Sequence, residues 1–250
     1  MRSEEPCETI DDLRRYDLRI IQPRDGYRFS VDPLLLAEFA VVQGGGRVAD
    51  LGSGSGILPL ILARRDKGVT AVGIEFQEAM AKLARRNVDL NGLGERVTIL
   101  REDVLNLRQS FPVSTFDLVV ANPPYRQRGR GRVSPKEGRD LARHESTATL
   151  TDFLAAAKYL VKPAGRICFI YLAERLADFL AAADRLKLSP LRLRMVHGTA
   201  SAAARMFLIE LAKGRKGELS ILPPMIVYEE DGGYTRELVE VLGNELGTSL

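Results

Sequence analysis

Short apolar runs alternate with helical segments along most of this chain, and this alternation strongly restricts its fold. Strands are predicted over residues 47–51, 69–75, 97–101, 116–121, 166–171, 188–196 and 205–212. A helix is predicted from Asp32, with apolar positions up to Phe39 and a stop at residues 44–46, and further helices are predicted over residues 57–65, 77–91, 151–160 and 173–186. Strands that alternate with helices favour a mostly parallel sheet covered on both faces. We therefore predict an α/β protein with a seven-stranded sheet.

The predicted domain organisation is simple. A chain of 250 residues can form one large domain with a modest appendage. We expect an N-terminal segment over 1–30, the main domain over 31–213 and a turn-rich extension of the same domain over 214–250. At the start of the first helix, Asp32 is placed to cap it and Pro33 to occupy its first position. Thr151 or Asp152 is placed to cap the helix that ends at residue 160.

Composition and cysteine usage exclude several classes of protein. Hydrophobic residues make up 45% and charged residues 28%, which is ordinary for a globular protein. We find no apolar run of the roughly 20 residues that a membrane span needs, and no secretory signal. Cys7 and Cys168 match no metal-ligand spacing, and two histidines offer little for a metal site. We expect a cytoplasmic monomer or homodimer with free thiols, no metal and no membrane segment.

A glycine-rich turn follows the first strand of the alternating region. Asp50 lies near the end of that strand. The turn then supplies Gly52, Ser53, Gly54 and Gly56. Glycines at a strand-to-helix turn can adopt positive φ and let a ligand approach the backbone closely. Such a turn lies at the carboxyl edge of a parallel sheet, where ligands bind, so we predict a ligand site rather than a plain tight turn.

Two features of this turn favour S-adenosylmethionine over a nicotinamide dinucleotide. The glycines run G-x-G-x-G, whereas the dinucleotide fingerprint is G-x-G-x-x-G. The carboxylate of Asp50 would repel a pyrophosphate but attract the ammonium group of S-adenosylmethionine. Glu75 ends the next strand, where its carboxylate can accept both hydroxyls of a ribose. We therefore predict S-adenosylmethionine as the cofactor.

The sequence Asn122-Pro123-Pro124-Tyr125 directly follows a very apolar strand. Its prolines lack backbone donors and stiffen the chain, while the carbonyls of Asn122 and Pro123 stay available as acceptors. With the side-chain carbonyl of Asn122 and the ring of Tyr125, this set suits a planar NH₂ group. A plain turn is the alternative.

An amine that is conjugated to a ring or a carbonyl is a poor nucleophile, because its lone pair is delocalised. Holding both N–H bonds in fixed directions can turn that lone pair toward the methyl group of a sulfonium. The protein would then contribute alignment and electrostatics rather than a strong base or a metal ion.

The segment from Asp50 to Gly56 resembles motif I of the class I S-adenosylmethionine-dependent methyltransferases. The likeness extends over about residues 30–212. It implies a Rossmann-like fold whose seven-stranded, mostly parallel sheet carries helices on both faces. It places Glu75 and the neighbouring Phe76 beside the cofactor's ribose. It likewise implies that Asp103 and Val104 lie beside the adenine, although Asp103 at a strand end is also a common turn residue.

The Asn122–Tyr125 segment resembles that of amino-methyltransferases acting on adenine N6, guanine N2 or glutamine amides. Residues 26–32 and the run Arg143-His144-Glu145 add a likeness to bacterial adenine-N6 methyltransferases of a valine tRNA. That likeness implies a tRNA partner, places Phe29, Ser30 and Asp32 near the cofactor and puts Arg143 and His144 near the substrate entrance. Here His144 would pack or face phosphate rather than act as a base. Guanine N2 of ribosomal RNA and a protein glutamine stay open, because these families share the motifs.

Arginines crowd the segment that follows Tyr125, although the net charge of the chain is only +3. Arg126, Arg128, Arg130 and Arg132 alternate with glutamine and glycine. Such a loop can order on phosphate, and its position beside the amine-holding motif favours RNA over a protein substrate. The alternatives are a solvated loop and a non-catalytic RNA-binding module of the same fold. The intact glycine turn speaks against the second.

Overall fold

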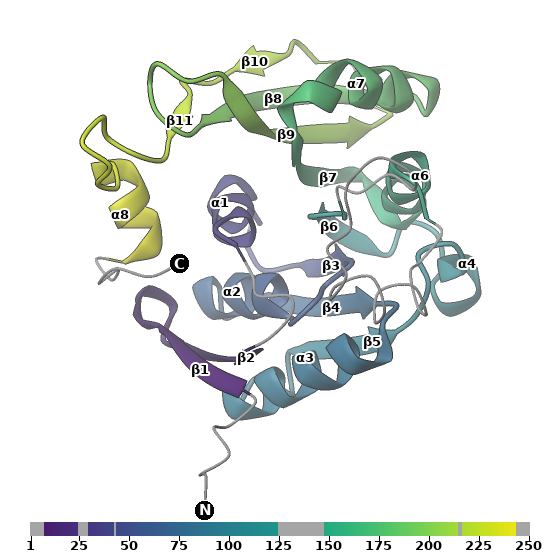
Figure 1. Ribbon diagram of the computed structural model, residues 1–250. Helices are drawn as coiled ribbons and strands as arrows, with labels where there is room; N and C mark the ends of the chain where they lie inside the picture. Colours follow the sequence, from purple (N-terminus) through teal and green to yellow (C-terminus); the bar gives the residue numbers. More distant parts are fainter. Residues whose placement is uncertain (1–7, 25–29, 43, 125–147, 215–216, 244–250) are drawn as a thin grey trace, which may run out of the picture.

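A strongly twisted sheet runs through the molecule in the computed structural model, which describes residues 8–24, 30–42, 44–124, 148–214 and 217–243 (Figure 1). Its strands, in spatial order, are β10 (Ser220–Ile221), β8 (Leu188–His197), β9 (Ala204–Lys213), β7 (Val161–Leu172), β6 (Phe116–Ala121), β3 (Arg47–Leu51), β4 (Thr70–Glu75) and β5 (Val97–Arg101). A ninth strand, β11 (Met225–Ile226), also pairs with β8. Among the strand pairs of this sheet in the described residues, β9 pairs antiparallel with β7 and with β8, and the other pairs are parallel. The seven predicted strands are therefore confirmed, and two short strands from the tail extend the sheet beyond β8.

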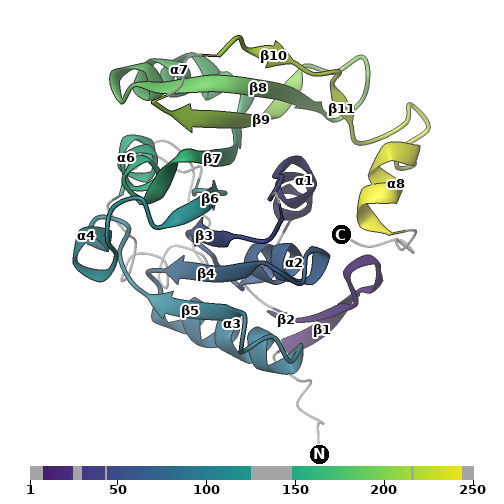
Figure 2. The same ribbon diagram turned by 180° about the vertical axis from the view of Figure 1, so that it is seen from behind.

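Helices cover both faces of the sheet, as predicted (Figures 1 and 2). One face carries α1 (Asp32–Phe39), α2 (Ile57–Arg65), α3 (Glu78–Leu90) and α8 (Arg236–Leu242). The other carries α4 (Leu107–Ser110), α6 (Leu150–Leu160) and α7 (Leu176–Arg185), the last of which follows the 3₁₀ helix η2 (Ala173–Arg175). Successive strand residues point to opposite faces, so Val48 packs with the first group and Ala49 with the second. The sheet thus separates two hydrophobic clusters.

An antiparallel hairpin precedes this core and forms a separate two-stranded sheet. It consists of β1 (Glu8–Leu13), the 3₁₀ helix η1 (Arg14–Tyr16) and β2 (Leu18–Pro23), and β2 packs against α3. The Tyr16 hydroxyl lies 2.8 Å from Oε1 of Glu38 and 3.2 Å from the carbonyl oxygen of Val241 in α8. The residues described before 24 are therefore folded onto the core, although the sequence indicated no element there.

Two predicted N-cap residues were wrong by one to three positions. Val31 is the N-cap of α1, so Asp32 lies inside the helix. Thr149 caps α6: its hydroxyl accepts a hydrogen bond from the backbone N–H of Asp152, whose side chain accepts from the N–H of Thr149. The reason is that this reciprocal capping box satisfies two backbone donors, which a cap at Thr151 could not do with Asp152 one residue away.

Residues 163–165, which precede the predicted strand 166–171, lie within β7. Phe116 pairs with Val161 and Leu118 with Arg166, so the register shifts and the intervening residues of β7 bulge out. A proline lacks the N–H that a regular ladder needs, and a bulge accommodates it without ending the strand.

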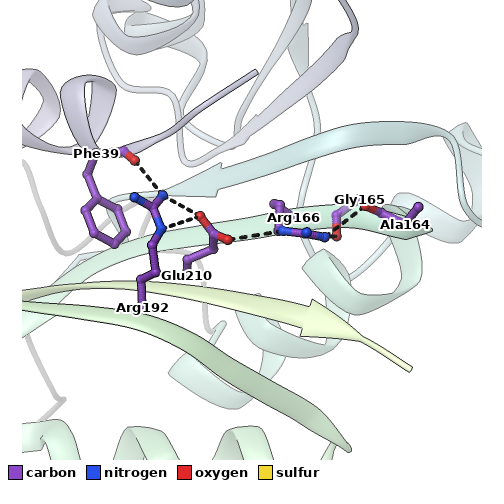
Figure 3. A network of polar contacts seen from close by, with 6 residues as sticks. All are labelled: Phe39, Ala164, Gly165, Arg166, Arg192 and Glu210. Atoms are coloured by element: carbon purple, nitrogen blue, oxygen red, sulfur yellow. Dashed lines mark hydrogen bonds and ion pairs between the residues drawn. The ribbon is translucent and has the colours of Figure 1, made fainter. Parts of the chain in front are cut away.

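A buried carboxylate ties three strands to the end of α1 (Figure 3). Glu210 on β9 is 8% exposed, forms an ion pair with Nε of Arg166 on β7 at 3.1 Å, and accepts a hydrogen bond from Nε of Arg192 on β8 at 3.0 Å. The Arg192 guanidinium also donates to the carbonyl of Phe39 at 3.1 Å and lies over the Phe39 ring. This network anchors the carboxyl end of α1 on the sheet.

The described residues contain no helix that is both long and apolar enough to cross a membrane. They also contain no group of three or more His, Cys, Asp or Glu side chains that could hold a metal ion. Cys168 is a free thiol buried in β7, and burial raises its pKa far above the ordinary range. Cys7 lies outside the described residues.

Candidate cofactor and substrate site

The glycine turn between β3 and α2 bends back over the end of β4. Gly52, Gly54 and Gly56 have φ values of +77°, +54° and +80°. The backbone N–H groups of Gly52 and Ser53 both donate to the carbonyl of Ile74, at 2.8 and 3.0 Å. Positive φ costs an L-residue about 1–2 kcal/mol, so the three glycines are what allow this path. Gly56 is also the N-cap of α2.

Glu75 lies against this turn. Its side chain is buried, with one oxygen accepting from the N–H of Gly54 and the other from the N–H of Gln77, both at 2.8 Å. Burial raises the pKa of Glu75, although these backbone donors lower it in part. The two hydrogen bonds fix the plane of the carboxylate while each oxygen keeps a lone pair for a further donor.

Asp50 is the most deeply buried acid of the site, at 2% exposure. Burial raises its pKa to about 7; the nearby Ser53 side chain opposes this rise and the negative charge of Glu75 adds to it. A buried carboxylate without a cation is costly to ionise, so a bound ammonium group would stabilise its charged form. This electrostatic setting suits the ammonium end of an amino acid.

Asn122 lies at the same pocket as the glycine turn. The residues that line this pocket are Pro33, Asp50, Gly52, Ser53, Gly54, Ser55, Ile57, Leu58 and Asn122. The reason is the sheet register: β3 and β6 are parallel neighbours, and Leu51 pairs with Ala121. The next residues, Gly52 and Asn122, therefore leave the sheet side by side. Two motifs that are far apart in the sequence meet at one edge.

Other predicted site residues lie near this edge without lining the described pocket. Phe76 follows Glu75, and Asp103 and Val104 follow β5, the neighbour of β4. Asp103 accepts from the N–H of Leu105 at 3.0 Å, so one of its oxygens is used within a turn. Val104 is buried in the cluster beneath α4 and α6.

The second half of the amine-holding motif is described only in part. Pro123 is buried and Pro124 is exposed. The remaining predicted residues lie outside the described part of the chain: Tyr125, Arg126, Arg128, Arg130, Arg132, Arg143 and His144.

Residues 31–177, well over half of the chain, match the family model described as "Methyltransferase small domain". The chain belongs to this family. It is a class I S-adenosylmethionine-dependent methyltransferase.

Relatives in bacteria are similar over most of the methyltransferase. A tRNA1(Val) (adenine(37)-N6)-methyltransferase of Aeromonas hydrophila is 28% identical over 223 residues, covering 87% of this chain and 89% of that protein. A protein of the same name from Porphyromonas gingivalis is 31% identical over 193 residues, covering 75% and 74%.

Solved structures resemble the fold. A predicted O-methyltransferase from Agrobacterium tumefaciens superposes with a TM-score of 0.69 at 22% identity, covering 88% of this chain and 99% of that one. TrmN from Thermus thermophilus superposes with a TM-score of 0.54 at 25% identity, covering 72% and 48%. The Rossmann-like fold predicted for the methyltransferase is confirmed.

The pocket of the methyltransferase fits the cofactor that its family uses. The Ser55 hydroxyl is buried and has no hydrogen-bond partner among the described residues, which is costly unless a ligand supplies one. A side chain at Gly73 would lie 2.5 Å from the Ser53 hydroxyl, so glycine in β4 makes room for the turn. The Asp50 carboxylate, two serine hydroxyls and the Asn122 amide thus line the pocket, and the Glu75 carboxylate contacts its backbone at Gly54, which suits an ammonium group and a ribose.

Sequence reasoning missed four pocket residues of the methyltransferase. Ser55, Ile57 and Leu58 adjoin the glycines of the turn, so their position in the motif was a usable signal. Pro33 had been interpreted only as a helix start, yet it lines the pocket from the first turn of α1. No local pattern could have shown that contact, because it depends on how α1 packs against α2.

Proposed function

We propose that this methyltransferase transfers the methyl group of S-adenosylmethionine to N6 of an adenine in tRNA. The observation that carries the proposal is the convergence of Asn122 with the turn Gly52–Gly54 at one pocket. A cofactor at the turn and an amine at Asn122 would be adjacent, as direct transfer requires. The bacterial relatives named above are adenine-N6 methyltransferases of tRNA, which favours that amine over a guanine or a glutamine amide.

The residues at and around the pocket have separate roles in this reaction. The cofactor, when bound, supplies an electrophilic methyl group. Asp50 attracts the ammonium group of the cofactor, and Glu75 accepts from its ribose hydroxyls. The side-chain carbonyl of Asn122 and the backbone carbonyl of Pro123 accept hydrogen bonds from the two N–H groups of the target amine. These two hydrogen bonds direct the nitrogen lone pair toward the methyl group. The surplus proton leaves the product amine for solvent, so no strong base is needed.

Cytoplasmic tRNA is then the substrate, and the basic segment from Arg126 to Arg143 is proposed to contact its phosphates. The target adenine must leave its stack to reach the pocket, as enzymes that modify bases require.

Labelled methyl transfer to total tRNA, followed by mass spectrometry of the nucleosides, tests this function. We expect N6-methyladenosine as the product, and no label after ribonuclease treatment of the substrate. Asn122→Ala should lower kcat by about 10²–10³-fold, the range for losing one aligned polar contact, while the cofactor dissociation constant changes less than about threefold. Label in guanine or in protein glutamine would refute the adenine assignment, and an equal loss of cofactor affinity would refute the role of Asn122.

A further inference from the structure

Asn87 joins the N-terminal hairpin to the glycine turn. It is fully buried on α3. Its Oδ1 accepts from the N–H of Ile21 in β2 at 2.7 Å. Its Nδ2 donates to the carbonyl of Ile21 at 3.2 Å and to the carbonyl of Ser55 at 2.9 Å. One amide group therefore connects three segments that are distant in the sequence.

The orientation of this amide follows from its neighbours. A backbone N–H faces Oδ1 and two backbone carbonyls face Nδ2, so the reversed orientation would lose all three hydrogen bonds. Ile21 contributes both its N–H and its carbonyl, and this pair holds the amide plane in place. The hairpin thereby orients the donor that reaches Ser55.

Ser55 is the part of the turn that most needs such an anchor. Gly54 and Gly56 flank it, and glycines give a backbone many conformations to lose on folding. Gly52 and Ser53 are held by Ile74, and Gly54 by Glu75. The carbonyl of Ser55 is held by Asn87.

Helix α3 also supports the turn through packing. Ala84 lies one turn before Asn87, and a side chain at Gly56 would lie 3.0 Å from the Ala84 Cβ atom. The same helix face thus contacts the turn at two adjacent positions, once by close packing and once by a hydrogen bond.

We propose that Asn87 is a positioning residue: it holds the glycine turn in its cofactor-binding conformation and makes the N-terminal hairpin a structural part of the cofactor site. The proposal rests on the proposed placement of S-adenosylmethionine at that turn. One part of the proposal does not depend on the cofactor: loss of Asn87 makes the backbone of Gly54–Gly56 more mobile even when no ligand is bound.

Asn91, one turn later on the chain, provides a matched control. Its Oδ1 accepts from the N–H of Arg19 at 2.8 Å, and its Nδ2 donates to the carbonyl of Arg19 at 2.7 Å. It therefore clamps the same strand with the same pair of bonds. Within the described residues, none of the hydrogen bonds of its side chain reaches the glycine turn.

The experiment compares Asn87→Ala with Asn91→Ala in the full chain. Calorimetry measures the cofactor dissociation constant, and hydrogen exchange follows the amides of Gly54–Gly56 without cofactor. We expect Asn87→Ala to weaken cofactor binding about tenfold and to speed exchange in the turn, with the cofactor KM raised and kcat changed less than about threefold. Asn91→Ala should leave cofactor affinity within about twofold, while both variants speed exchange in β2.

Cofactor affinity within twofold of the wild type in Asn87→Ala, or equal weakening in both variants, would overturn the proposal. If Asn87→Ala does not fold, Asn87→Asp keeps the size of the side chain and the bond from Ile21 while removing the donor to Ser55, and the same outcomes apply. Glu75→Gln separates the two claims. If Glu75→Gln leaves cofactor affinity unchanged, the proposed cofactor site is wrong. If Glu75→Gln weakens cofactor binding while the Asn87 variant binds normally, only the positioning role of Asn87 is wrong.

Discussion

Asp50 makes the methyltransferase sensitive to pH at the level of one side chain. Its pKa is raised from 3.8 to about 7, so between these values an unfolded chain ionises Asp50 while the cofactor-free fold keeps it protonated. The unfolded state then binds fewer protons, and the free energy of unfolding must fall as pH rises through this window. For every pH unit that separates the folded pKa from the unfolded pKa, the free energy of unfolding falls by about 1.4 kcal/mol.

We expect the cofactor-free protein to lose stability between about pH 4 and pH 7 more steeply than Asp50→Asn, which cannot ionise. Cofactor affinity should change in the opposite sense: an ammonium group favours ionised Asp50, so binding should tighten as pH rises through about 7 in the wild type only. Urea unfolding and calorimetry at a series of pH values measure both. Parallel pH profiles for the two proteins would contradict the assignment.

The sequence was informative wherever a residue's position follows from strand order. Asp50, Gly52 and Asn122 could be placed together because each lies at the end of a parallel strand, and such ends share an edge. Asn87 could not be found in this way. An asparagine on a helix is usually exposed, and its burial here depends on a hairpin that packs against α3 from outside the sheet.

At the level of elements, the capping box of α6 offers a test of local stability. Thr149→Ala removes the hydroxyl that accepts from the N–H of Asp152. We expect a loss of about 1 kcal/mol in the free energy of unfolding, the usual cost of losing such a cap. Thr151→Ala is the control, because Thr151 is exposed in the first turn and alanine is the better helix former. Urea unfolding compares them, and a larger loss in Thr151→Ala would place the cap elsewhere.

Elements with a strong periodic pattern were predicted closely, and short ones were missed. The predicted bounds of β3, α2, β5 and β6 agree with the structure to the residue. By contrast, β10 and β11 have two residues each and exist only because β8 offers them an edge. A two-residue strand has no alternation to detect, so its signal is tertiary rather than local.

Across the whole molecule, the Glu210 network joins the antiparallel part of the sheet to α1 (Figure 3). Arg192→Met keeps most of the aliphatic stem but leaves a nearly buried carboxylate with Arg166 as its remaining ion-pair partner among the described residues. We expect a loss of about 2 kcal/mol, below the range for fully buried pairs because the Arg192 side chain is 30% exposed.

Adding Glu210→Leu to Arg192→Met should recover part of that loss, because the buried charge that has lost one of its two cationic partners is then gone. A double-mutant cycle by urea unfolding measures the coupling between the two residues. Simple additivity of the single effects would show that the network does not act as a unit.

The contact between Tyr16 and the carbonyl of Val241 joins residues that are 225 positions apart. During synthesis, η1 therefore leaves the ribosome long before α8 exists to cover it. The clamp between Ile21, Ser55 and Asn87, in contrast, needs only about the first third of the chain. The nascent enzyme can thus arrange its glycine turn early, while one flank of the same hairpin stays uncovered until translation has almost reached the end of α8.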